Sequence, residues 1–166
     1  MFKKVILVLA MVAALPVALC AQKFGIVDAQ AVLTALPEFT QMQDQLATAS
    51  KEYEGEFTKL QEEMNKKIQE YQALAQDTPQ AIRERRESEL QEYDQKIQQF
   101  RNNASQQLQQ QQQKLMEPIE KKLIDAINAV GQEGAYTFIF QKGQSLYEGT
   151  DVKDLTPEVK AKLGIK

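Results

Sequence analysis

Apolar residues recur at alternating steps of three and four along the first half of the chain, beginning at Phe39. Glu, Lys and Gln fill most of the positions between them. A stripe this narrow predicts one helix of about 39 residues that packs against a single partner helix rather than inside a large core. The stripe consists of Phe39, Met42, Leu46, Ala49, Tyr53, Phe57, Leu60, Met64, Ile68, Tyr71 and Ala75.

A second stripe of the same kind begins at Ile82. The segment "AQDTPQ" separates the two stripes and offers Asp77 or Thr78 as a helix cap, with Pro79 as the first helical residue. Two long helices with matched stripes and a short connection predict an antiparallel hairpin. Its tip is expected near residues 77–80.

The second helix changes character along its length. Residues 102–115 are almost entirely polar and rich in Gln, yet they contain no helix breaker. Pro118 is expected to bend the helix, and beyond it the apolar residues become denser from 119 to 130. The sequence therefore predicts a solvated middle and an end that approaches a core, with Gly131 and Gly134 ending the helix.

Short apolar runs at both ends of the chain predict strands. "KFGIVDA" favours a strand over residues 23–27, followed by a helical turn that Asp28 can cap. "YTFIF" at 136–140 and "SLYE" at 145–148 flank the turn "QKGQ", which favours a β-hairpin.

The predicted fold class is α+β, with a long antiparallel helical hairpin projecting from a small β body. Residues 22–37 and 131–166 form the body, and residues 38–130 form the arm. A short last helix in the body is expected to begin with Thr156 as its cap and to end before Gly164.

Three short strands with little covering helix cannot bury enough surface to be stable alone. The residues that need additional cover are Phe24, Ile26, Phe138, Phe140 and Leu146. Closure with other copies of the chain into a shared, barrel-like body would supply that cover. We therefore expect these five residues to lie in an interface between copies.

Residues 1–21 have the features of a secretory signal peptide, with two lysines followed by an apolar run from Val5 to Leu15. Cleavage after Cys20 and cleavage after Ala21 both fit the small-residue rule. The alternative is a lipoprotein anchored through Cys20. No later run approaches the length of a membrane span, so the sequence predicts an exported, soluble protein.

The composition of the chain argues against several classes of function. Without Lys3 and Lys4 the chain has 18 basic and 23 acidic residues, a net charge of −5, which argues against nucleic acid as a partner. The chain has no His and no Trp, and its one Cys lies in the signal segment. This composition excludes acid–base catalysis by His, Cys nucleophiles and zinc sites built from His or Cys, and the Ser, Asp and Glu residues form no catalytic set. We expect no enzyme activity, no catalytic residues, no cofactor and no metal.

The layout resembles the Skp (OmpH-like) family of periplasmic chaperones. The matching parts are the signal segment, "FGIVDAQAVL", the helical hairpin, "YTFIF" and the ending "LYEGTDVKDLTPEVKAKL". The ending is the most specific of these parts, and the resemblance covers essentially the whole chain after the signal. Unlike the strongly basic best-known members, this chain is acidic.

The resemblance implies a periplasmic homotrimer in which each copy contributes strands to a central body and one helical arm. It implies an ATP-independent holding chaperone whose arms enclose unfolded outer-membrane proteins and prevent their aggregation. The alternative function is an exported coiled-coil spacer or tether.

The tip segment "IRERRESE" places Arg83, Arg85 and Arg86 among three glutamates. Two interpretations remain open for these arginines. They are candidate tip contacts to an anionic membrane surface or to acidic client segments. The other interpretation is ordinary short-range pairing along the helix, which is favoured because the glutamates cancel most of the field. Tyr53 and the other seam tyrosines, Tyr71 and Tyr93, are expected to pack between the helices.

Overall fold

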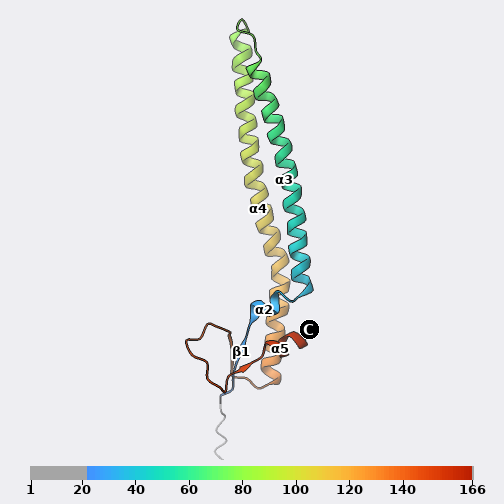
Figure 1. Ribbon diagram of the computed structural model, residues 1–166, viewed down its shortest axis with the longest axis vertical. Coiled ribbons are helices and arrows are strands. Elements are labelled where there is room, and N and C mark those ends of the chain that lie inside the picture. The colour runs from blue at the N-terminus through green and yellow to red at the C-terminus, as the bar shows by residue number, and fades with distance from the viewer. Residues whose placement is uncertain (1–21, 166) are drawn as a thin grey trace, which may run out of the picture.

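The computed structural model describes residues 22–165. Figure 1 shows a long helical hairpin standing on a small body, where the first strand and the last helix lie close together. The signal segment, with its expected cleavage sites and the alternative of lipidation at Cys20, lies outside the described residues. The elements are β1 (Phe24–Val27), α2 (Ala29–Leu33), α3 (Pro37–Gln72), α4 (Gln80–Glu133), β2 (Phe138–Gln141), β3 (Lys153–Asp154) and α5 (Thr156–Lys162).

The three strands form one sheet in the order β2-β1-β3, and both outer strands run parallel to β1. The expected β-hairpin is therefore wrong, because residues 145–148 form no strand and β3 lies at 153–154 instead. A strand at 145–148 paired only with β2 would leave one edge of β1 open. Pairing β1 on both sides satisfies both rows of its backbone groups.

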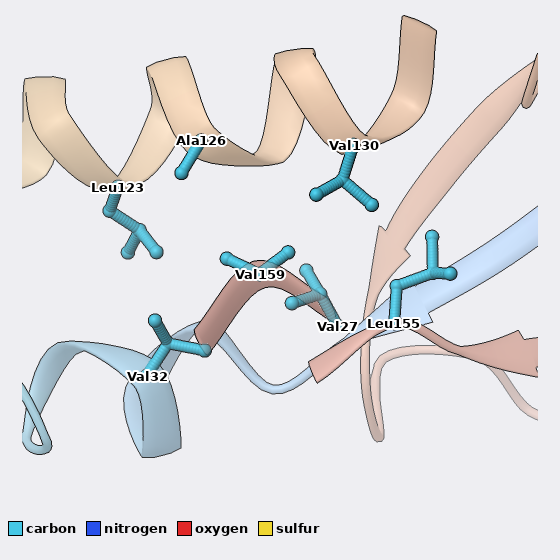
Figure 2. Packing of buried hydrophobic residues seen from close by; sticks show 7 residues of the cluster. All are labelled: Val27, Val32, Leu123, Ala126, Val130, Leu155 and Val159. Carbon is cyan, nitrogen blue, oxygen red and sulfur yellow. The ribbon is translucent and has the colours of Figure 1, made fainter. Parts of the chain in front are cut away.

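The core lies between the sheet and the last third of α4. Figure 2 shows Leu123, Ala126 and Val130 of α4 facing side chains from the sheet, α2 and α5. The sequence predicted that α4 approaches a core after Pro118, where apolar residues become denser. This prediction is confirmed, since this end of α4 packs into the body. The full cluster is Val27, Val32, Leu123, Ala126, Val130, Leu155 and Val159.

Side-chain caps connect the short elements of the body. Asp28 caps α2 as predicted, because its Oδ1 accepts a hydrogen bond of 2.8 Å from the backbone N–H of Ala31. Thr156 does not cap α5 but is its first residue. The Thr156 hydroxyl instead accepts a hydrogen bond of 2.9 Å from the Asp28 N–H, while Asp154 Oδ1 accepts one from the Thr156 N–H.

The arm is the predicted antiparallel hairpin of α3 and α4, and α4 runs unbroken through Pro118. The expected cap at Asp77 or Thr78 is wrong, because α4 begins one residue later, with Pro79 at the cap position and no side-chain cap. The guanidinium of Arg83 instead holds the connection between the helices by donating to the carbonyl oxygens of Ala75 and Thr78.

A second cluster joins the arm to the body. Leu36, Met42 and Ile119 are buried together where α3 and α4 leave the core. Lys122 of α4 donates a hydrogen bond to Glu38 of α3 beside this cluster, which lowers the pKa of Glu38. The base of the arm is therefore the part of the hairpin most firmly tied to the body.

Candidate interaction surfaces

One side of the sheet carries three aromatic rings, which we call the aromatic face: Phe24, Phe138 and Phe140. The rings contact one another at centroid distances of 6.2 Å, 6.3 Å and 6.0 Å. The parallel register pairs Phe24 with Phe138, and alternation turns these side chains away from the core. Phe138 is 56% exposed and Phe140 49%. A contiguous aromatic surface that remains open in a single chain is typical of an interface.

The loop at residues 142–152 carries two further large, exposed hydrophobic side chains. Leu146 and Tyr147 project from it into solvent, and Figure 1 shows this loop swinging out beside the body. Its two ends are tied together, because Lys142 Nζ donates a 2.7 Å hydrogen bond to Asp154. This contact, together with hydrogen bonds from Thr156, lowers the pKa of Asp154 to about 2. The loop thus presents two large apolar side chains from a closed base.

The structure brings together three of the five residues expected in the shared body. Phe24, Phe138 and Phe140 form the aromatic face, whereas Leu146 lies apart from them in the loop. Ile26 points to the same side of the sheet but is only 6% exposed, so it is already buried within one chain. Tyr147 was missed, although its position next to Leu146 in a Gly- and Ser-bearing loop was visible in the sequence.

The seam tyrosines bridge the two helices of the arm. Tyr53 packs edge-on against Phe100, with ring centroids 6.1 Å apart. The Tyr71 and Tyr93 hydroxyls each donate a hydrogen bond to a glutamate of the opposite helix, Glu87 and Glu63 respectively. The bond to Glu63 raises the pKa of Tyr93 to about 12. The tyrosines therefore serve the hairpin itself, as expected from their spacing.

The three tip arginines all have partners within the arm. Arg83 holds the carbonyls of the connection, as described above. Arg85 and Arg86 both form ion pairs with Glu89, at 3.4 Å and 2.7 Å. These contacts are the short-range pairing expected from the sequence, and contact of the tip with a membrane or a client stays a prediction.

No helix within residues 22–165 combines the length and hydrophobicity that a membrane span requires. In the same part of the chain, His, Cys, Asp and Glu side chains nowhere gather in threes that could hold a metal ion. The features that distinguish the described residues are therefore surfaces: the aromatic face, the exposed loop and the long sides of the arm.

Fold and surfaces together define a class of elongated proteins, in which a small body with a parallel sheet carries one helical hairpin. A sequence model of the family described as "Outer membrane protein (OmpH-like)" matches residues 23–163, and the chain belongs to this family. A solved structure with this fold is an OmpH-like protein from Caulobacter crescentus CB15, provisionally assigned as an outer membrane chaperone. The two are 15% identical with a TM-score of 0.74, covering 87% of this chain and 85% of the other. The search of curated proteins found no match.

Proposed function

We propose that this protein is an ATP-independent holding chaperone of the periplasm that binds unfolded outer-membrane proteins. Family membership supports a chaperone role in general. The observation that carries the proposal is the pairing of an open aromatic face on the body with an arm whose surface is almost entirely polar. One surface suits assembly, and the other suits repeated weak contact with a client.

The aromatic face supports assembly into a homotrimer. Phe138 and Phe140 are half exposed in a single chain, and covering each ring in an interface is worth roughly 1 kcal/mol or more. Three copies meeting through this face would bury the rings together, with Leu146 and Tyr147 of the loop within reach of a neighbouring copy. The number three follows from the family resemblance, and the three arms would then surround a common space.

The polar arm suits a chaperone that must stay soluble while it binds apolar chains. Around its thin seam the arm presents Gln, Glu and Lys, whose methylene stems offer weak apolar contact without forming an aggregating surface. The Gln106–Gln113 segment of α4 is mostly exposed and carries no charge, so it neither repels nor fixes a client. Many such contacts acting within an enclosed space give useful affinity through multivalency.

Two measurements test this proposal on the chain without its signal segment. Light scattering after size exclusion is expected to give the mass of a trimer. A urea-unfolded β-barrel protein diluted into buffer is expected to stay soluble at one trimer per client. A folded monomer, or a trimer that leaves aggregation unchanged, would contradict the proposal, and the second result would favour a spacer or tether.

A matched pair of variants separates assembly from surface hydrophobicity. The double change Phe138→Ser and Phe140→Ser is expected to reduce the native mass to that of one chain. Ile82→Ser removes another exposed apolar side chain, 41% exposed, but at the far end of the arm. This control is expected to keep the trimer mass.

A further inference from the structure

The arm carries a shallow groove of about 350 Å³ near the middle of the hairpin. Tyr53 and Phe57 of α3 line one side of the groove, and Phe100 of α4 lies opposite them. Ala104 and Ser105 on the next turn of α4 are too small to fill the space beside these rings. The groove is therefore an aromatic-lined hollow in an arm that is otherwise polar.

One positive charge at the rim of the groove has no ion-pair partner in the described part of the chain. The Arg101 guanidinium lies over the Phe57 ring, 5.6 Å from its centre. Arg101 belongs to none of the ion pairs formed by residues 22–165. The other charged lining residue, Glu54, is within 3.5 Å of the Ser50 hydroxyl of its own helix.

The surrounding stretch of α4 favours an anionic group. Residues 95–116 contain no Asp or Glu, while they include Lys96, Arg101 and Lys114. This segment is an acid-free band in a chain that is acidic overall. A carboxylate that approaches Arg101 from outside therefore meets no like charge from residues 95–116, and Glu54 of α3 is the acidic side chain in the groove lining.

We infer that this groove binds an aromatic side chain of an extended, unfolded polypeptide, with an acidic residue two positions further along held by Arg101. In an extended chain, residues i and i+2 point to the same side and lie roughly 6.6 Å apart. Phe57 and Arg101 line the same groove, so two side chains on one side of an extended chain can reach the aromatic lining and the guanidinium together. The inference rests on the proposed chaperone function and adds a preferred sequence pattern for its clients.

The chain contains no Trp, so a peptide with a single Trp can be followed by its own fluorescence. The experiment uses two extended ten-residue peptides, one with Trp-Ser-Glu at its centre and one with Trp-Ser-Gln. Each is titrated with the full chain lacking its signal segment. The Glu peptide is expected to bind about three-fold more tightly than the Gln peptide, as an exposed ion pair allows.

Variants of the groove then identify the contact. Arg101→Gln is expected to remove the preference for the Glu peptide, and Arg101→Lys to restore part of it. Phe57→Leu is expected to weaken both peptides equally. Lys96→Gln is the matched control, because Lys96 also lies over an aromatic ring, at 5.0 Å from the Tyr93 centre, but outside the groove. This control is expected to keep the wild-type preference.

Several outcomes would overturn the groove assignment. No change in Trp emission, equal binding of the two peptides, or a preference that survives in Arg101→Gln would each reject it. The aggregation assay run in parallel distinguishes this failure from failure of the proposed function. If aggregation is still suppressed, only the groove proposal falls, whereas loss of suppression in the wild-type protein rejects the chaperone function itself.

Discussion

Gly25, in the middle strand of the sheet, lies directly against the buried side chain of Leu155. A Cβ added at Gly25 would lie 2.5 Å from Leu155 Cδ1 and 3.2 Å from Tyr136 Cδ1. The first distance is far below van der Waals contact, and Leu155 is only 1% exposed, so it has little room to move. Gly25→Ala is therefore expected to destabilise the body by about 1–3 kcal/mol through overpacking.

Leu155→Ala removes the same contact from the other side. Truncating a buried Leu costs about 2–5 kcal/mol because it loses apolar burial and leaves a cavity. In the double variant the new Cβ at position 25 enters the space that Leu155 has vacated. The double variant is therefore expected to be more stable than the sum of the single effects by about 1 kcal/mol or more.

The measurement is urea unfolding followed by far-ultraviolet circular dichroism at one fixed protein concentration, because assembly makes stability concentration-dependent. Gly55→Ala is the control. Nothing lies within 4 Å of a Cβ at Gly55 in the arm, so this change is expected to stabilise by up to about 1 kcal/mol. If the two single effects at Gly25 and Leu155 added to within about 0.5 kcal/mol, the packing argument would be refuted.

Three further predictions concern single contacts. Hydrogen bonds from Lys142 and Thr156 depress the pKa of Asp154 from 3.8 to about 2, so the stability lost in Asp154→Asn should be full above pH 4 and vanish as pH falls through 2 in urea titrations. The pKa of Tyr93 is raised from 10.0 to about 12 by Glu63, so the advantage of wild type over Tyr93→Phe should be full below pH 10 and vanish toward pH 12 in thermal melts. Arg83→Ala should speed amide exchange in the connection on the order of five-fold, since its carbonyl contacts are lost; unchanged exchange there would contradict that role.

Periodicity predicted the parts of the fold that depend on local sequence. The alternating steps from Phe39 onward define α3 and its seam, and the denser apolar run after Pro118 marks where α4 enters the core. The strand at β1 and the cap at Asp28 also follow from short local signals. These features need only the neighbouring residues to be specified.

The third strand could not be predicted in this way. Lys153 and Asp154 form a strand only because β1 offers a free edge, and two polar residues carry no strand pattern of their own. The run at 145–148 has a better strand pattern but pairs with no strand among residues 22–165. Residues 153–154 are a strand and residues 145–148 are not because only the former pair with β1. Such pairing depends on the whole fold and not on local sequence.

The candidate surfaces also combine features set by local sequence with features set by the whole fold. The sequence analysis grouped Phe24, Phe138 and Phe140 among residues that need cover, and in the structure their rings lie on one side of the sheet. It could not show that Ile26, grouped with them, is already buried within one chain. The mid-arm groove depends on how two helices are set against each other. The acid-free band at 95–116 was the one sequence signal that could have pointed to it.

The continuity of α4 explains how so polar an arm remains folded. An isolated hairpin with a seam this thin would be marginal, because most helix stability in proteins comes from packing an apolar face. Here α4 runs from the tip into the core, where Leu123 and Val130 are buried, and Leu36 with Met42 fixes α3 beside it. Packing at the base of the arm therefore offsets the unfavourable free energy of nucleating both helices. The outer arm need only propagate from that base, so its exposed surface can be almost entirely polar without loss of the fold.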